Sequence, residues 1–450
     1  MKKYIRLYAV ILCMSVIAAA FAGCNGGGTE NPSAAVTEEK DWAASVSFNP
    51  DATDTAKTSA TVKSYIDGDT THFIVPDSVV PGGVLKARYI AINTPESTGK
   101  IEEYGKTASE FTKSKLQEAK YIYLESDTST WDPDSTGSRY LAWVWYKTSN
   151  ESEWRNLNIE ILQNGLAIAS SSANNKYGSA AVSAIQQAKA LKLNIYSGEK
   201  DPNFYYGDAV ELSLRELRTN IADYNGVKVA FEGVITQNSS NGIYIEEYDA
   251  ETDVYFGMYV YYGFSLSGDG LDILSVGNRA RIVGTVSFYE TGGTWQVSGL
   301  TYRAMKPDDP GNIQKISEGN APAYVEITVE KFLDGKVTVT NGDATKELRY
   351  AEAALGSTVS VKGLVVDSVY TTESEDSSSK GAMTLTCHGS DGRSISVRTT
   401  VLYDENNNIV TADAYKGKTI DVKGIIDFYN GGYEDTYQIK VFRTSDITVK

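Results

Sequence analysis

The spacing of hydrophobic residues predicts a group of short strands in the first third of the chain. Hydrophobic and polar residues alternate over residues 62–66, 70–75 and 86–92, and a period of two is typical of half-buried β-strands. A fourth, strongly aromatic run covers residues 140–146. Together these runs indicate a small β-barrel closed by helices, in which every second side chain is buried.

One helix and two tryptophans add to this picture. Apolar residues recur near the helical period over residues 104–119, so we expect a helix there that packs across the sheet. Trp143 and Trp145 stand two positions apart in the aromatic strand and therefore share one face of it. Packing in the barrel is the favoured interpretation for both, ahead of stacking on nucleic-acid bases.

Beyond residue 209 the alternation continues and predicts a second, all-β part of the chain. A short helix is expected ahead of it, over residues 212–224. An internal repeat determines the architecture, since residues 276–289 match 416–429 and residues 225–234 match 355–364. In the first copy the predicted strands are 227–235, 242–246, 255–262, 279–289 and 295–297.

Each copy of the repeat has a glycine in the middle of two of its strands. Glycine inside a strand often marks a bend, which a small barrel needs where one strand serves both of its halves. This pattern resembles the OB-fold, a five-stranded Greek-key barrel that holds oligonucleotides and oligosaccharides. The four positions are Gly233, Gly284, Gly363 and Gly424.

The N-terminus has the pattern of an export signal. Residues 1–23 begin with basic residues, continue with a short apolar run and end in small residues. The ending Phe21-Ala-Gly-Cys24 resembles the bacterial lipobox, which implies cleavage before Cys24 and a lipid on its sulfur. A plain signal peptide or an uncleaved anchor is the alternative. The resemblance implies a bacterial protein held by this lipid anchor on the extracytoplasmic face of the cell membrane.

The segment after the signal is expected to be a flexible tether, since residues 24–58 are rich in small and polar residues. Only Cys387 would remain as a free thiol in the processed chain, so no intramolecular disulfide is expected. The 450 residues allow two to four domains.

The charge of the second half argues against a basic nucleic-acid surface. The chain has a formal net charge of −16, and residues 201–450 hold 22 Lys and Arg against 36 Asp and Glu. A barrel that grips phosphate normally shows a basic stripe. Exposed tyrosines can stack on bases without one, while oligosaccharide, cell-wall or protein contact is an alternative of equal weight. The tyrosines considered are Tyr255, Tyr259, Tyr261 and Tyr262.

A group of polar residues in the first region suggests phosphate chemistry. Asp67 and Asp69 sit in a turn between two predicted strands, and a later strand stops at a proline just after Asn93. Asn93 and Glu96 can then face the same space as Asp69. Carboxylate, amide and backbone oxygens are the ligands of hard cations such as Ca²⁺. Arg88 adds a fork that suits a phosphate group.

This region resembles the staphylococcal nuclease-like thermonucleases. Their motifs are I-D-G-D-T, an arginine-bearing strand that runs into D-T-P-E, and a later arginine before L-A. Three helical segments look like those of the family and come in the same order. The resemblance covers about residues 60–197. The matching motifs are residues 66–70, Arg88 with 93–96, and Arg139 with 141–142, and the helical segments are 104–112, 157–165 and 188–196.

The resemblance implies a Ca²⁺-dependent phosphodiesterase, an endonuclease or exonuclease that acts on DNA and RNA. Asp69 would bind the metal directly, and the backbone carbonyl of Thr94 would be a further ligand. Glu96 would be the general base, while Arg88 and Arg139 would bind the phosphate and stabilise the charge that builds on it.

Asn93 departs from the family, which has an aspartate at this position. The amide keeps an oxygen ligand for the metal but removes one negative charge. Because the charge of the ligands tunes Ca²⁺ affinity, we expect weaker Ca²⁺ binding than is typical of the family.

The expected protein is mainly β with helices, and we expect a monomer. An OB-type five-stranded barrel with three helices is followed by two tandem OB-fold-like β-barrels. Three functions stay open: a tethered nuclease, a catalytically weakened nucleic-acid- or glycan-binding protein, and an adhesion protein whose barrels hold wall glycans or proteins. The expected segments are 1–23 (signal peptide), 24–58 (tether), 59–200 (nuclease-like domain), 209–305 and 322–450 (OB-fold-like domains).

Overall fold

The computed structural model describes most of the chain after residue 38. The predicted signal peptide, Cys24 and the first part of the tether lie outside the described residues. In the part that the structure describes, no helix is both long and apolar enough to cross a membrane. The described ranges are 39–98, 101–239, 241–264, 266–341, 344–374, 377–430 and 435–450.

The first domain is a closed five-stranded barrel, as predicted. Its strands lie in the order β3-β2-β1-β5-β6, and a parallel pair between β3 and β6 closes the barrel, with Arg88 opposite Leu141. The side chains of Trp143 and Trp145 are fully buried, which confirms that they pack in the barrel. The strands are β1 (Lys57–Tyr65), β2 (Thr70–Ile74), β3 (Val84–Tyr89), β5 (Tyr121–Glu125) and β6 (Tyr140–Lys147), with the short β4 (Ile92–Asn93), β7 (Arg155–Asn156) and β8 (Ile168–Ala169) beside them.

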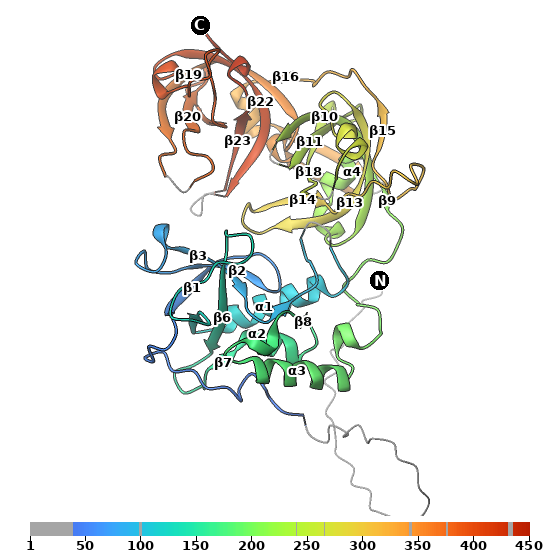
Figure 1. The fold of residues 1–450 in the computed structure, drawn as a ribbon. Helices are drawn as coiled ribbons and strands as arrows, with labels where there is room; N and C mark the ends of the chain where they lie inside the picture. The colour runs from blue at the N-terminus through green and yellow to red at the C-terminus, as the bar shows by residue number, and fades with distance from the viewer. Residues whose placement is uncertain are drawn as a thin grey trace, which may run out of the picture. The chain divides into compact units, whose positions relative to one another are not determined.

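Three helices accompany this barrel, also as predicted, and Figure 1 shows them lying next to one another. The last helix differs from the expectation over residues 188–196, because it covers Gly178–Ala190 and overlaps the expected range only at residues 188–190. Lys192 and Asn194 adopt positive φ, which interrupts a right-handed helix. The helices are α1 (Gly105–Glu118), α2 (Leu157–Gln163) and α3 (Gly178–Ala190).

Packing against this domain begins well before the predicted boundary at residue 59. Residues 40–48, here called the N-terminal strap, were expected to belong to the flexible tether. The backbone N–H of Lys40 and the indole N–H of Trp42 both donate to the side chain of Gln187 in α3, at 3.1 and 3.0 Å. Ala43 is fully buried, and Phe48 stacks on Trp145 with ring centroids 4.9 Å apart. The strap is therefore part of the folded domain.

The second domain is an OB-like barrel closed by antiparallel pairing of β10 with β13. A short helix, α4 (Leu214–Thr219), precedes the barrel within the range predicted for it. β15 pairs with β13, so this barrel extends beyond the predicted boundary at residue 305. Its elements are β9 (Val210–Glu211), β10 (Lys228–Ser239), β11 (Gly242–Asp249), β12 (Val254–Tyr261), α5 (Asp269–Ile273), β13 (Arg279–Tyr289), β14 (Thr294–Ser298) and β15 (Gln314–Ser317).

The third domain repeats this architecture, and β19 pairs with β22 to close it. Figure 1 shows its long strands gathered around one axis. Its elements are β16 (Val325–Glu326), α6 (Val329–Asp334), β17 (Lys336–Asn341), β18 (Ala344–Arg349), α7 (Tyr350–Ala353), β19 (Thr358–Thr371), β20 (Met383–His388), β21 (Ser394–Thr399), β22 (Thr419–Asn430), β23 (Asp435–Val441) and β24 (Ile447–Val449). Within the described ranges, the short 3₁₀ helices are η1 (Pro81–Gly83), η2 (Ser172–Asn174), η3 (Asn194–Tyr196), η4 (Ile221–Tyr224), η5 (Ala412–Ala414) and η6 (Thr444–Asp446).

The mid-strand glycines mark the points where a strand changes partner. β13 pairs with β10 as far as Thr285 and with β14 from Thr285 onward, directly after Gly284. β22 changes from β19 to β23 at Ile425, directly after Gly424. A Cβ atom on Gly424 would lie 2.6 Å from the carbonyl oxygen of Lys440, so no side chain fits where the sheet folds over. The predicted bends are thus confirmed at these strands.

The two OB-like barrels share one hydrophobic core cluster. A buried carboxylate lies within their contact: Glu246 of β11 accepts hydrogen bonds from the backbone N–H groups of Ala323 and Thr358, at 2.8 and 2.7 Å. The hydroxyl of Thr358 also donates to it, at 2.8 Å. Buried carboxylates are tolerated when donors satisfy them in this way.

Candidate active site

A tight turn between β1 and β2 presents two carboxylates on one edge of the first barrel. The backbone N–H of Asp67 donates to the carbonyl of Thr70 at 3.2 Å, which closes the turn. The N–H of Asp69 donates to the carboxylate of Asp67 at 3.1 Å. Both carboxylates are buried, with 8 % and 1 % of each residue exposed.

The turn is held in place by its glycine and by α1. A Cβ atom on Gly68 would lie 2.8 Å from a side-chain carbon of Thr94 and 3.0 Å from the Cβ of Ala108. The hydroxyl of Thr112 donates to the carbonyl of Gly68 at 2.7 Å. This fixes the depth of the carboxylates relative to α1 and to the loop after β4.

Arg88 connects the predicted metal ligands. It lies opposite Thr70 in the β2–β3 pair, and Thr70 is the residue that follows Asp69. Its guanidinium donates to the carboxylate of Asp69 and to the side-chain oxygen of Asn93. The backbone N–H of Thr94 donates to the other carboxylate oxygen of Asp69, at 2.9 Å. The structure therefore brings Asp69, Arg88, Asn93 and Thr94 together, as the sequence predicted.

The loop that carries Glu96 is fixed by the start of α1. The backbone carbonyl of Glu96 accepts a hydrogen bond from the N–H of Glu102 at 2.8 Å. A Cβ atom on Gly105, the first residue of α1, would lie only 2.1 Å from the same carbonyl oxygen. Burial raises the pKa of Glu96, and the nearby charge of Asp69 raises it further, while Arg88 opposes the shift. A carboxylate with a raised pKa suits a general base, because it holds a proton more strongly.

Arg139 directly precedes β6, and the first residue of that strand, Tyr140, pairs with Ala87 of β3. Arg139 is close enough to lower the pKa of Glu96. Its Nε donates to the carboxylate of Asp134 at 2.7 Å. Sequence reasoning did not identify Asp134 as a partner, although the two residues flank a short polar turn that could have indicated it. The second predicted phosphate ligand is thus paired with a carboxylate.

Asp67 is a further candidate, for which no specific role was predicted from the sequence. Burial raises its pKa to about 7, and repulsion from Asp69 contributes to the increase. Two neighbouring buried carboxylates repel each other and would be stabilised by a cation between them.

The side chains fit a hard cation by their chemistry. Carboxylate and amide oxygens converge here, and the hydroxyl oxygen of Thr94 is buried without a hydrogen-bond partner. Oxygen donors of this kind are preferred by Ca²⁺. In the described ranges there is no group of three or more His, Cys, Asp and Glu residues placed to hold a metal. A cation here would therefore also need the amide of Asn93, backbone oxygens and water.

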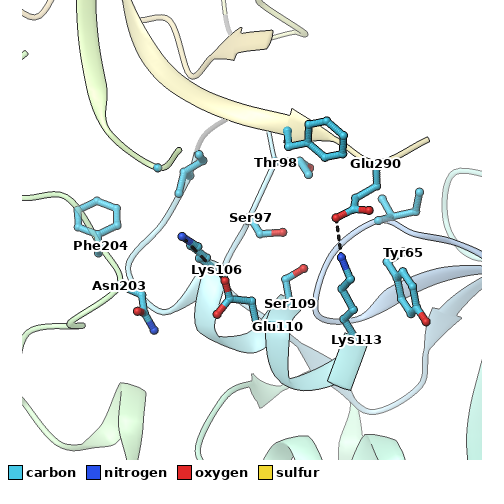
Figure 2. A pocket seen from close by; sticks show the side chains of 14 residues that line it. Tyr65, Ser97, Thr98, Lys106, Ser109, Glu110, Lys113, Asn203, Phe204 and Glu290 are labelled. Atoms are coloured by element: carbon cyan, nitrogen blue, oxygen red, sulfur yellow. Dashed lines mark hydrogen bonds and ion pairs between the residues drawn. The ribbon is translucent and has the colours of Figure 1, made fainter. Parts of the chain in front are cut away.

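Two hollows flank the loop that bears Glu96. A groove of about 660 Å³ is bordered by Asn93, Pro95, Tyr104 and Tyr196. A smaller cavity of about 130 Å³ lies beyond Ser97, along α1. Figure 2 shows the smaller cavity with Lys106, Ser109, Glu110 and Lys113 along one wall, where Lys113 forms an ion pair with Glu290 at 2.6 Å. The larger groove reaches Asn93, so it is the hollow that borders the candidate site.

The start of α1 depends on a residue far along the chain. The carboxylate of Asp201 accepts from the backbone N–H of Tyr104 at 2.7 Å and from the hydroxyl of Thr107 at 3.1 Å. The first N–H groups of a helix lack partners within the helix, and acceptors of this type satisfy them. Asp201, just after the nuclease-like domain, thus stabilises the start of α1, which contacts the loop that carries Glu96.

The first domain thus combines an OB-type barrel, three helices, and convergent arginine and carboxylate groups. Residues 86–198 match the model of the family described as staphylococcal nuclease homologue, a family of nucleases, and this part of the chain is such a domain. The matched range includes Arg88, Asn93, Thr94, Glu96 and Arg139 and begins after Asp69. The search of curated proteins found no match.

Proposed function

We propose that this chain is a Ca²⁺-dependent nuclease that hydrolyses phosphodiester bonds of DNA or RNA. The observation that carries the proposal is the hydrogen bonding of Arg88 to both Asp69 and Asn93, with the backbone of Thr94 bound to the same carboxylate. The residues proposed to bind phosphate and those proposed to bind the cation are thereby in contact, which supports a role in phosphoryl transfer.

In the proposed mechanism Glu96 accepts the proton of the attacking water. Arg88 and Arg139 bind the phosphate oxygens and stabilise the additional negative charge of the transition state. Asp69, Asn93 and the carbonyl of Thr94 would hold Ca²⁺, which when bound neutralises phosphate charge and makes bound water more acidic. The arginines must exchange carboxylate partners for phosphate, since Arg88 binds Asp69 and Arg139 binds Asp134.

The test is hydrolysis of single-stranded DNA and of RNA by the full chain, with Ca²⁺ or with a chelator. We expect cleavage that the chelator abolishes and that Glu96→Gln reduces strongly. Asn93→Asp adds one ligand charge, so half-maximal activity should occur at a roughly tenfold lower Ca²⁺ concentration. Equal activity with Ca²⁺ and with chelator would exclude the proposed mechanism.

A catalytically weakened binding protein is the second candidate. It is favoured by the neutral amide of Asn93 and by the pairing of both arginines with carboxylates in the structure. It predicts that the parent chain binds oligonucleotides without cleaving them and that only Asn93→Asp cleaves. The same assay therefore separates the two functions.

We also propose that the protein is attached to the outer face of a bacterial membrane through a lipid on Cys24. The support is the sequence of the first 24 residues, with a basic start, an apolar run and Ala-Gly before the cysteine. Labelled palmitate should be incorporated into the parent and not into Cys24→Ser. Incorporation into both proteins would show that Cys24 is not the site.

A further inference from the structure

A row of polar and aromatic side chains crosses the third domain, which is the second of the two OB-like barrels. Tyr370 of β19 lies opposite Thr384 of β20, Thr384 opposite Arg398 of β21, and Arg398 opposite Lys440 of β23. Residues directly opposite each other in neighbouring strands point to the same face of a sheet. The row faces outward, because the adjacent strand residues are fully buried in the core: Leu385, Val397 and Ile439.

Arg398 is the unusual member of this row. Its two terminal nitrogens donate only to threonine hydroxyls, to Thr384 at 3.0 Å and to Thr372 at 3.1 Å. Across the described ranges, no Asp or Glu forms an ion pair with it. Burial lowers the pKa of Arg398, and the nearby hydroxyls of Tyr370 and Tyr429 partly offset this effect. A half-buried cation with neutral partners has lost hydration that an anion can replace.

Two exposed tyrosines come from β19 and β22, strands that lie on either side of β21 in the order of the sheet. Tyr370 is 65 % exposed near the end of β19, and Tyr429 is 57 % exposed near the end of β22. The tyrosines of β12 considered from the sequence are less accessible. Tyr259 is half-buried and packs against Tyr244 with ring centroids 5.1 Å apart. Of the tyrosines compared, the two that are exposed near a cation, Tyr370 and Tyr429, therefore lie on the second OB-like barrel.

We propose that Tyr370, Arg398 and Tyr429 form a binding site for single-stranded nucleic acid. The tyrosines stack on bases, and Arg398 binds a backbone phosphate between them. Unpaired bases offer the flat faces that stacking requires, whereas in a duplex these faces are covered. A neutral glycan would also stack on tyrosine but would supply no anion for Arg398. The ligand is the same class of polymer as in the proposed function, but the site does not require that the chain cleaves it.

The experiment measures binding of a fluorescein-labelled oligothymidylate to the full chain by anisotropy, in chelator. An Arg139→Gln background reduces phosphate binding by the first domain. We expect Tyr370→Ala and Tyr429→Ala each to weaken binding by about tenfold. Arg398→Gln should weaken binding and lower the slope of log K against log salt by about 0.7, the value of one phosphate contact on a single strand. Tyr248→Ala is the matched control, since this tyrosine is 44 % exposed on the other OB-like barrel.

A second measurement locates the site directly. An oligonucleotide that carries 5-iodouracil should cross-link under ultraviolet light to peptides that contain Tyr370 or Tyr429. The proposal is wrong if all three variants bind like the control, if duplex DNA binds as well and with the same losses, or if only cell-wall glycan is bound. Cleavage with Ca²⁺ is measured in parallel. Cleavage by a parent whose barrel variants bind normally would refute this inference and leave the proposed function intact.

Discussion

Arg88 donates a hydrogen bond to the buried carboxylate of Asp69, so a predicted phosphate ligand and a predicted metal ligand are paired with each other. The side chains are 18 % and 1 % exposed, which places the pair in a region of weak solvent screening. A cation and a phosphate that enter together would replace this internal pair with two new ones. The pair therefore holds both side chains in position before either ligand binds.

Arg88→Gln should lower both stability and turnover. Removing one partner of a buried ion pair costs about 3–5 kcal/mol, and loss of a transition-state donor lowers kcat by about 10²–10³. Added Ca²⁺ should raise the melting temperature of this variant more than that of the parent, because it would neutralise the buried charge of Asp69 that has lost its partner. Arg88→Lys should recover stability more than turnover, since an ammonium group does not form the same fork. Equal Ca²⁺ effects on variant and parent would contradict this account.

Gly105→Ala should disturb the position of Glu96. The added methyl group would lie 2.1 Å from the backbone oxygen of Glu96, so the loop or the helix must shift. Overpacking of this kind costs about 1–3 kcal/mol, and we expect a loss of activity beyond the loss of stability. Gly311→Ala is the control, because its nearest neighbour is a side-chain atom of Asp309 at 3.2 Å. Unchanged activity in a folded Gly105→Ala protein would show that this contact does not position Glu96.

Asp201→Ala should destabilise the start of α1. It removes the acceptor for the N–H of Tyr104 and for the hydroxyl of Thr107, and loss of a helix cap costs about 1–2 kcal/mol. Asp201→Asn keeps an acceptor and should retain most of the stability. Hydrogen exchange at the first turn of α1 is the local measurement. Equal exchange rates in Asp201→Ala and the parent would show that the contact does not stabilise the helix.

Glu246 should make the contact between the OB-like barrels sensitive to pH. Burial raises its pKa above the usual 4.5, although hydrogen bonds from Ala323 and Thr358 act in the opposite direction. Since the pKa is higher in the folded state than in the unfolded state, this group contributes its full stability below the unfolded pKa. That contribution is lost as pH rises through the folded pKa.

The measurement is the melting temperature of Glu246→Gln relative to the parent. The parent should lose stability relative to this neutral variant as pH rises from about 4.5 to neutral. Thr358→Val, which removes one donor to the carboxylate, should increase the loss. A difference that stays constant over this range would mean that the net pKa shift is not upward.

The barrels could be predicted because their patterns are local. Gly284 and Gly424 occupy equivalent positions in two copies of one repeat. Each directly precedes the residue at which its strand changes partner. The N-terminal strap was missed for the opposite reason. The hydrogen bond from Lys40 to Gln187 joins residues 147 positions apart, and no periodicity in the strap itself indicates it.

The candidate site shows the same contrast. Asp69, Arg88 and Asn93 could be placed together because they occupy motif positions of a family that this region resembles, although Asn93 differs from the family in residue type. The partners that hold them are not contained in that motif. Thr112 reaches Gly68 from a helix face, and Asp134 binds Arg139 across a turn whose conformation the sequence pattern did not define.

The N-terminal strap has a mechanical consequence. If the chain is anchored ahead of residue 39, a pulling force enters the domain at Lys40 and acts first on hydrogen bonds to Gln187 of α3. These bonds and the packing of Phe48 on Trp145 must yield before the load reaches β1 at Lys57. Detachment of the strap would then lengthen the linkage by the extended span of about 17 residues, roughly 60 Å, while the barrel and its site stay folded.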